Sequence, residues 1–424
     1  MSFQQGLSGL NSIAKSLDVT GNNVANANTY GAKSSRAEFA DLYASSLSGE
    51  GLNNVGIGVS VAAITQQFSQ GAAVNTENPL DLSISGKGFF QMASSDGGVN
   101  YTRNGQFKID KDGFIVNNNR DKLMGYAADD AGTIQPGQAL ALQIPTAGIK
   151  PFATTEIKFE INIDPRVAVT APSPTAVPQI DLTDPKTYNN ATSVSVFDVK
   201  GQTVNLVYYF QKAATDQWNV YVTANGKPVA QDGVGNPLPS TALTFPSTGG
   251  APTLPVGGLT SIDIPSSTNA AGAVTEPIAG VNLNFSGATQ YGSSFSVTNL
   301  SQDGYAPGQL NGVTIDASGV ISVRYSNGQF KAAGQLEMAN FRNPQGLMAL
   351  GGTTWARTTA SGEAMVGTPG AGSFGSLQAG SLESSNVDLT GELVNLITAQ
   401  RAYQANAQTI KTQDQVLQTL VNLR

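Results

Sequence analysis

The end of the chain carries a regular spacing of apolar residues that predicts a long helix. From Leu389 to Val421, mostly apolar side chains recur at alternating steps of four and three residues. A 3.5-residue repeat of this length predicts an α-helix whose apolar stripe packs against another helix. Asn386 or Asp388 is suited to cap its start. The stripe consists of Leu389, Leu393, Leu396, Gln400, Tyr403, Ala407, Ile410, Asp414, Leu417 and Val421.

A similar stripe begins the chain, and it predicts a helix from residue 1 to about 27. The Asn-rich run 22–28 should end this helix, because Asn amides compete for backbone hydrogen bonds. Two narrow stripes at opposite ends of one chain most simply pair with each other. The N-terminal stripe consists of Phe3, Leu7, Leu10, Ala14, Leu17 and Val24, with Gly21 in one position.

These stripes predict a terminal helical domain from residues 1–30 and 384–424. Helix packing, or packing between copies of the chain, should depend on their larger apolar residues. The set that we expect to carry it is Leu7, Leu10, Leu17, Val24, Leu389, Leu393, Leu396, Tyr403, Ile410, Leu417 and Val421.

The remaining surface of the C-terminal helix is rich in Gln, Asn and Thr and almost free of charge. Outside the stripe, Arg401 and Lys411 stand nearly alone. A solvated surface helix usually carries interspersed Lys and Glu. The amide-rich surface therefore indicates either contact with other chains or the lining of a wet, neutral cavity. A terminal helix docked on its own domain is the alternative.

Between the helices the pattern changes to the alternation that is typical of strands. In 71–146, Leu82 and Ile84 alternate with polar residues, and an Asp110-Lys-Asp-Gly113 turn is followed by an apolar run. The zone 302–363 has the same style, and it repeats both the turn, at 316–319, and the pentapeptide Asn-Gly-Gln-Phe-Lys. These two zones should form the halves of one inner β domain.

The insertion at 147–301 should be a separate outer β domain, bounded by Pro- and Thr-rich runs. Alternating residues from Val204 to Phe210 and from Trp218 to Val222 predict two strands, and Asn225-Gly226 predicts a hairpin turn. Its Gly- and Pro-rich part, 232–276, should form long surface loops. The sequence thus predicts a multidomain α+β fold, with paired terminal helices and two mainly antiparallel β domains inserted between them.

Residues 31–70 and 364–383 should link the helices to the inner β domain. We expect a short helix through Ala37, Phe39, Leu42, Tyr43 and Leu47 and a strand from Val55 to Val61. Gly-rich stretches near 48–58 and 366–380 should let the domains tilt relative to the helices.

Composition excludes several kinds of function. The 424 residues include no Cys and no His, which removes disulfides, thiol nucleophiles, common zinc sites and the commonest general base. Only 12% of residues are charged and the net charge is −7, so a nucleic acid partner is not expected. No apolar run is long enough to span a membrane, and we expect no cleavable secretion signal. The Asp110 turn lacks the Glu that closes a calcium loop, and no cofactor or metal is expected.

Both ends of the chain resemble the bacterial flagellar rod and hook family. The N-terminal residues are Met1-Ser-Phe-Gln-Gln-Gly-Leu-Ser-Gly-Leu-Asn11 and Asn22-Asn-Val-Ala-Asn-Ala-Asn-Thr-Tyr-Gly31. The C-terminal residues are Ser384-Ser-Asn-Val-Asp-Leu389, Glu392-Leu-Val-Asn395 and Ala399-Gln-Arg-Ala-Tyr-Gln-Ala-Asn-Ala-Gln-Thr-Ile410. The ending 411–424, the run 104–108 and the stretch 336–346 are similar to those of hook proteins in particular. Ala32 stands where the family usually has an aromatic residue, and Tyr30 can supply its packing.

The resemblance implies a structural subunit and not an enzyme. Such proteins polymerise into the flagellar hook, a curved extracellular tube that passes motor torque from rod to filament as a universal joint. Their terminal helices form the inner tube around an export channel, and their β domains form outer layers. The implied partners are further copies of the chain, the distal rod, hook cap and hook–filament junction proteins, and the type III export apparatus, which delivers the subunit without a cleaved signal.

Two alternatives remain open at this stage. A distal rod protein would share both terminal signatures, but rod proteins are generally shorter and lack the large insertion. A non-flagellar surface adhesin would explain the β-rich, Cys-free middle and would less easily explain helical stripes at both ends.

Overall fold

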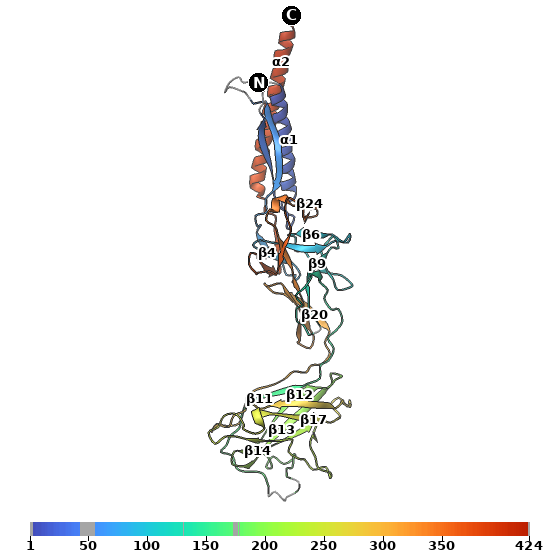
Figure 1. Ribbon diagram of the computed structural model, residues 1–424, viewed down its shortest axis with the longest axis vertical. Helices are drawn as coiled ribbons and strands as arrows, with labels where there is room; N and C mark the ends of the chain where they lie inside the picture. Colours follow the sequence, from blue (N-terminus) through green and yellow to red (C-terminus); the bar gives the residue numbers. More distant parts are fainter. Residues whose placement is uncertain (1–2, 43–55, 130, 173–176, 178, 423–424) are drawn as a thin grey trace. The chain divides into compact units, whose positions relative to one another are not determined.

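A computed structural model describes residues 3–42, 56–129, 131–172, 177 and 179–422 (Figure 1). The chain divides into two compact units. The first comprises residues 1–146, 311–324 and 330–424 and holds both helices. The second comprises 147–310 and 325–329, somewhat more than the 147–301 that the sequence predicts. The fold is α+β, as expected, with helices only near the two ends of the described chain apart from two short 3₁₀ turns.

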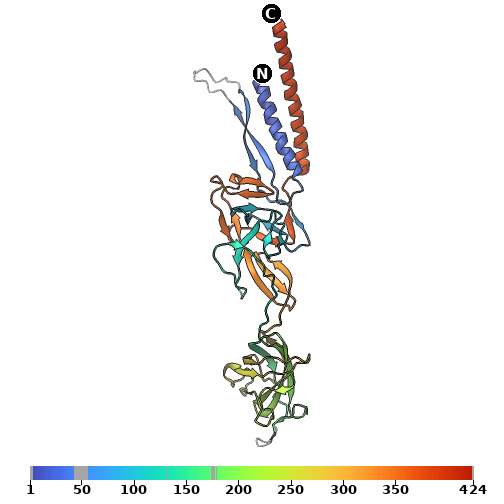
Figure 2. The same cartoon turned by 90° about the vertical axis from the view of Figure 1, so that its right-hand side faces the viewer.

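Both predicted helices are present. Helix α1 spans Phe3–Ala25 and ends in the Asn-rich run, where the Asn26 N–H donates to the carbonyls of Asn22 and Asn23. Helix α2 spans Leu389–Asn422. Asp388 caps its start, because Oδ1 of this residue accepts the Thr390 N–H at 3.0 Å. The helices run side by side and antiparallel, and α2 continues beyond the start of α1 (Figures 1 and 2).

A two-stranded hairpin follows α1. Strand β1 (Ser35–Leu42) pairs antiparallel with β2 (Gly58–Gln66). The helix that we predicted through Ala37, Phe39 and Leu42 is therefore wrong within the described residues, while Tyr43, Leu47 and Val55 lie outside them. The strand forms because residues 58–66 satisfy its backbone groups, and this pairing is not visible in the local sequence. Of the turn residues after α1, Ala32 is buried and Tyr30 is half-buried.

The β core of the first unit is built around one sheet of 13 short strands, nearly all of them antiparallel neighbours. Its main path runs β20-β21-β22-β9-β5-β6-β25-β24. Aromatic residues fill the space beside β5, with Phe89, Tyr101, Phe341 and Trp355 buried together. The strands of this sheet are β5 (Phe89–Ala93), β6 (Val99–Thr102), β7 (Lys108–Ile109), β8 (Ile115–Val116), β9 (Lys122–Ala127), β10 (Leu140–Ala141), β20 (Leu310–Ile315), β21 (Val320–Tyr325), β22 (Phe330–Leu336), β23 (Met338–Asn340), β24 (Met348–Gly351), β25 (Thr354–Ala356) and β26 (Met365–Gly367).

Residues 364–383, which we expected to be a linker, contain three paired strands. Strand β26 pairs with β23, β27 (Ser376–Ala379) pairs with β4 (Leu82–Ser85), and β28 (Ser381–Glu383) pairs with β3 (Ala73–Asn75). The Gly-rich stretch 366–380 is therefore not a free hinge, because its backbone is hydrogen-bonded to the β core. Residues 48–55 of the other expected hinge lie outside the described residues.

The repeated turn sequence has a common geometry. Oδ1 of Asp110 accepts the N–H groups of Asp112 and Phe114, and Oδ1 of Asp316 accepts those of Ser318 and Val320. Gly113 and Gly319 take positive φ angles of 86° and 79° at the last turn position. The carboxylate of Asp110 thus holds a tight turn, which confirms the turn predicted at 110–113.

The second unit is a β sandwich of two sheets. One has the order β17-β18-β11-β19, and the other has the order β12-β13-β14-β15 with β16 on β14. The core lies between the sheets, where the ring of Phe159 on β11 meets that of Tyr208 on β13 with centroids 4.9 Å apart. The strands are β11 (Glu156–Asn162), β12 (Asn190–Phe197), β13 (Thr203–Ala214), β14 (Gln217–Ala224), β15 (Lys227–Pro228), β16 (Thr241–Thr244), β17 (Leu259–Ile264), β18 (Ile278–Asn284) and β19 (Ser296–Gln302).

Predictions for this unit held in part. The hairpin turn is confirmed, since Asn225 and Gly226 join β14 to β15 with φ angles of 49° and 83°. Pairing is mainly antiparallel, with β11 and β18 as a parallel exception. The range 232–276 is not only loop, because β16 and β17 lie within it and pair with β14 and β18.

Candidate polymerisation surface

The two helices meet through small residues on α1, which face Ile410 of the predicted C-terminal stripe and Asn406 beside it. A Cβ atom added to Gly6 would lie 3.0 Å from Cγ1 of Ile410, and one added to Gly9 would lie 3.3 Å from Oδ1 of Asn406. The buried residues of α1 are Gly6, Ser12, Val19, Thr20 and Asn23, which recur along one face of the helix. Because glycine and serine add little bulk, the helix axes can approach closely on this face.

Near the C-terminal end of α1, Asn23 connects this helix to the start of α2. Its amide nitrogen donates to Oε1 of Glu392 on α2 at 2.9 Å and to the Ser35 carbonyl at 2.8 Å, and its amide oxygen accepts the Ser35 N–H at 2.8 Å. One buried side chain therefore joins α1, α2 and the start of the hairpin. The sequence interpretation missed this residue, because it read the Asn-rich run only as a helix end.

The predicted stripes are mostly uncovered. The two helices do contact each other, and Ile410 of the predicted stripe lies against Gly6, but the described close contacts on α1 are made by glycines and not by its leucines. No described side chain of α2 is fully buried. Among the eleven predicted packing residues, those that the structure leaves exposed are Leu7, Leu389, Leu393, Tyr403, Leu417 and Val421, and those half-buried are Leu10, Leu17, Val24, Leu396 and Ile410.

Further large apolar residues of α2 are exposed outside this stripe. Val394, Ile397 and Val416 on α2 are at least 50% exposed, and none of them was predicted. Helix α2 continues past the start of α1 (Figures 1 and 2), and Leu417 and Val421 follow Ile410, which lies against Gly6 near that start. Large apolar side chains gathered on an unpartnered helix mark a protein contact surface. We call the exposed apolar residues of the two stripes, together with Ile397, the helix surface.

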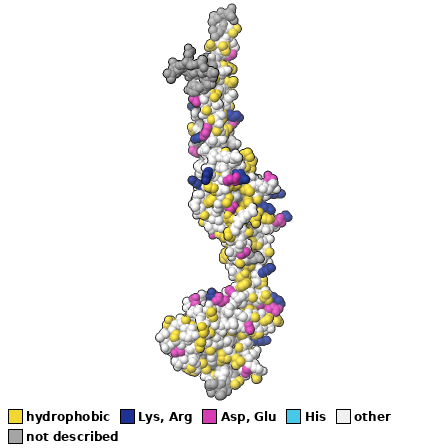
Figure 3. All heavy atoms as spheres, in the orientation of Figure 1, with side chains coloured by type: hydrophobic (Ala, Val, Ile, Leu, Met, Phe, Trp, Pro, Cys, Tyr) yellow, Lys and Arg dark blue, Asp and Glu magenta, His cyan; other side chains and the backbone are white. Residues whose placement is uncertain are grey.

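On the polar side of α2, the threonine hydroxyl groups are already hydrogen-bonded within the helix. Thr398, Thr409, Thr412 and Thr419 donate their hydroxyl groups to backbone carbonyls four residues earlier in the same helix. Charged side chains are few and scattered along the helices on the face drawn in Figure 3. This side is therefore close to neutral, and its hydroxyl donors are already used.

A groove lies between α1, α2 and the β1–β2 hairpin. Its volume is about 690 Å³, and residues of all three elements line it, among them Ser12, Ser16, Arg36 and Ala402. Phe39 and Ile64 of the hairpin are 44% and 52% exposed, so the hairpin adds apolar area next to the helices. Within the described residues, neither helix is apolar enough over sufficient length to cross a membrane.

Comparison with known families gives matches along most of the chain. Residues 3–33 match the model of the flagella basal body rod protein, and residues 83–171 match that of the flagellar hook protein FlgE/F/G D1 domain. Residues 162–305 match the flagellar basal body protein FlaE D2 domain, and residues 378–423 match the C-terminal model of the flagellar basal body rod FlgEFG proteins.

Individual proteins match over the full length. The flagellar hook protein FlgE of Salmonella typhimurium is 42% identical over 427 residues, and that of Escherichia coli K12 is 41% identical, each covering 100% of both chains. A crystal structure of the Helicobacter pylori flagellar hook protein FlgE2 aligns with 73% of this chain and 100% of that chain, at 15% identity and a TM-score of 0.49. Identity above 40% over the whole of both chains is decisive, and the chain belongs to the flagellar hook protein FlgE family.

Proposed function

We propose that this chain polymerises into the flagellar hook, with the helix surface buried between neighbouring copies. The observation that carries this proposal is the exposure of large apolar residues on both helices, since a soluble monomer gains nothing by exposing them. In the polymer, the helices form the wall of a tube and the β units lie outside it. The role is structural, and it involves no catalytic step and no cofactor.

The polar side of α2 fits the lining of an export channel. An unfolded protein in transit would be held back by a charged wall, and this side carries few charges, with Val394 and Val416 as exposed apolar residues on it. The channel side and the packing side would thus be different faces of one helix. The proposed partners beyond further copies are the distal rod protein, the hook cap protein, the hook–filament junction protein and the type III export apparatus, which places the chain outside the cell.

Electron microscopy of the purified full-length chain under polymerising conditions tests this proposal. We expect the wild-type chain to form bent tubes and the Leu393→Asp/Ile397→Asp variant to form none. Straight tubes would support a rod subunit instead, and the absence of polymer under all conditions would support a surface adhesin. The rod alternative is disfavoured, because the relatives that match over the full length are named hook proteins.

A matched genetic test uses a strain without its own hook protein. The wild-type chain should restore hooks and swimming, and the Leu393→Asp/Ile397→Asp variant should not. A control variant, Val199→Asp/Val234→Asp, places the same two charges at apolar residues of the second unit that are 63% and 89% exposed. Loss of hooks in the control as well would mean that the helix surface has no special part in assembly.

A further inference from the structure

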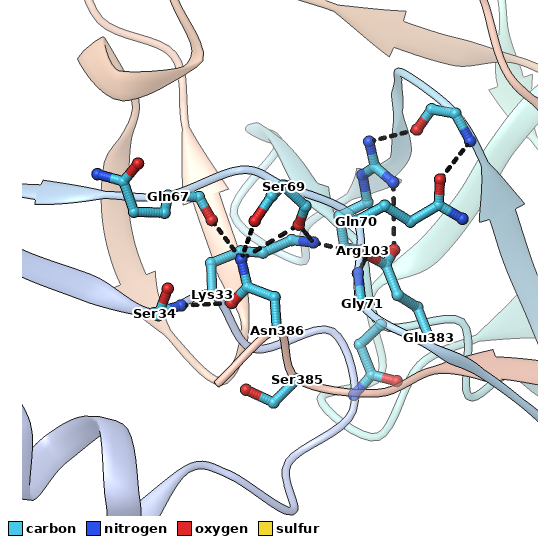
Figure 4. Close-up of polar contacts among 12 residues, drawn as sticks. Lys33, Ser34, Gln67, Ser69, Gln70, Gly71, Arg103, Glu383, Ser385 and Asn386 are labelled. Carbon is cyan, nitrogen blue, oxygen red and sulfur yellow. Dashed lines mark hydrogen bonds and ion pairs between the residues drawn. The ribbon is translucent and has the colours of Figure 1, made fainter. Parts of the chain in front are cut away.

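A buried polar cluster lies where the chain passes between the helices and the β core of the first unit (Figure 4). The chain makes this passage twice, through residues 67–72 between β2 and β3 and through residues 384–388 between β28 and α2. We call these two segments the connectors. The four side chains that link them are Lys33, Arg103, Glu383 and Asn386, which we call the joint cluster.

Glu383 is the centre of the joint cluster. Its side chain is 1% exposed, and Oε1 accepts the Lys33 ammonium at 2.6 Å and the Gly71 N–H at 2.9 Å. Oε2 accepts Nη1 of Arg103 at 3.1 Å. Lys33, whose side chain is fully buried, also donates to the Ser69 carbonyl at 2.8 Å. One carboxylate thus binds the turn after α1, the first connector and the β core.

Asn386 adds a second set of links. Its oxygen accepts the Ser34 N–H at 2.7 Å, and its nitrogen donates to the Gln67 carbonyl at 2.7 Å and to Oγ of Ser69 at 2.8 Å. The connectors also touch directly, since the Ser384 N–H donates to the Ala72 carbonyl at 2.8 Å. A Cβ atom on Gly71 would lie 2.0 Å from the Ser384 carbonyl oxygen, so only glycine allows this approach.

The first connector is also anchored in the aromatic core. The ring of Phe68 packs edge-on against Phe89 and Trp355 with centroids 5.5 and 5.4 Å apart, and Nε1 of Trp355 donates to Oε1 of Gln66 at 2.5 Å. The Arg103 guanidinium lies 5.3 Å from the centroid of Phe89. The joint cluster is therefore attached to the packed aromatic core of the first unit.

The charges make this arrangement resistant to deformation. Two buried cations share one buried carboxylate, and burial lowers the pKa of Lys33 while Glu383 opposes that shift. If either connector rotated away from Glu383, Lys33 and Arg103 would become unpaired buried charges, which is strongly unfavourable. A compliant hinge would instead consist of solvated residues with few side-chain bonds.

We propose that the joint cluster makes the two connectors one rigid joint, through which torque passes between the terminal helices and the β core. The inference rests on the proposed function and assigns these four residues a mechanical role in it. Twisting of the connectors is prevented by the cluster, so deformation of the hook falls on contacts between subunits.

Amide hydrogen exchange of the purified full-length chain tests the joint. In Glu383→Gln, we expect amides of both connectors to exchange at least about tenfold faster, because a buried charged partner is lost. Amides of β5 should be unchanged. The control, Glu363→Gln, removes an ion pair with Arg357 on the same unit whose carboxylate is 85% exposed, and it should change neither region. Unchanged connectors in Glu383→Gln would overturn the proposal.

A milder variant provides the test if Glu383→Gln unfolds the β core. Asn386→Ala removes no charge, and we expect it to speed exchange at residues 67–69 while β5 stays protected. Equal loss of protection in β5, or no change at either place, would show that the joint is not a separate element and would overturn the proposal.

Torsional compliance separates a mechanical role from a merely structural one. In cells tethered by hooks with the motor locked, the angular fluctuation measures how far the hook twists. Asn386→Ala hooks of normal length should be more compliant than wild-type hooks, and Glu363→Gln hooks should not be. Equal compliance of Asn386→Ala and wild-type hooks would overturn the proposal. A wild-type chain that builds no hook would instead refute the proposed function, and the rigidity of the joint would then be tested by hydrogen exchange alone.

Discussion

Replacing Leu393 with Ala should weaken polymerisation without unfolding the monomer. Leu393 lies near the start of α2 and is 45% exposed, so nearly half of its surface remains for a neighbouring copy to cover. Full burial of a leucine contributes about 1.5–3 kcal/mol. The exposed part therefore corresponds to about 0.7–1.4 kcal/mol that only the polymer gains.

This free energy converts into a measurable concentration. The critical concentration for growth equals the dissociation constant of a subunit from the polymer end, and about 1.4 kcal/mol changes such a constant tenfold. We therefore expect the critical concentration of Leu393→Ala to rise about 3- to 10-fold. Sedimentation of polymer from solutions of increasing concentration measures it, and far-UV circular dichroism checks that the monomer keeps its helix content.

The matched control is Thr412→Ala, which truncates an exposed residue on the polar side of the same helix. It should leave the critical concentration unchanged. The reasoning would be refuted if Leu393→Ala polymerised like wild type, or if both variants weakened polymerisation equally. In the second case, α2 would be packed on all sides and the helix surface would not be a distinct face.

Three further changes test the interior of the first unit. Gly9→Leu should destabilise the helix pair by about 1–3 kcal/mol, because its side chain would enter the space of Asn406; thermal loss of the far-UV helix signal measures this. Phe68→Ala should cost about 2–4 kcal/mol in urea unfolding followed by tryptophan fluorescence, since the ring packs on the aromatic core. The hydrogen bond to Glu337 raises the pKa of Tyr126 to about 12, so this group stabilises the fold below pH 10 and loses that contribution as pH rises through 12; Tyr126→Phe should show a smaller fall in unfolding free energy over that range.

Each of these changes has a control or a contrary outcome. Gly21→Ala is the control for Gly9, since a Cβ atom there would meet nothing within 4 Å, and it should raise helix stability by up to about 1 kcal/mol. An unchanged urea midpoint for Phe68→Ala would mean that the connector does not belong to the core. A pH profile of Tyr126→Phe parallel to that of wild type would show that the Glu337 bond has no effect on the folded state.

Features encoded in neighbouring residues were predictable from the sequence. The end of α1 follows from the Asn-rich run after it, and the start of α2 follows from Asp388, one of the two caps proposed. The turn at Asn225 and Gly226 follows from residues that tolerate positive φ. Each of these features needs no knowledge of the rest of the chain.

Features that depend on distant partners were not predictable. Residues 37–42 have no strong preference of their own, and they form a strand because residues 58–64 pair with them. The joint cluster brings together Lys33, Arg103 and Glu383, whose positions differ by as many as 350 residues. A single charged residue in each of three unrelated segments gives no pattern along the sequence.

The apolar stripes were recognised from the sequence, but the part of them that one chain leaves uncovered was not. A heptad of large apolar residues indicates that some helix will be covered on that face, but it does not say whether the cover belongs to the same chain. The close contact within this chain uses Gly6 and Gly9, which no apolar pattern detects. If Leu7 and Leu10 had filled the α1–α2 contact, the chain would have satisfied its own stripes and kept little apolar surface for assembly. Small residues inside the pair and leucines outside it therefore leave the subunit folded and still able to bind its neighbours.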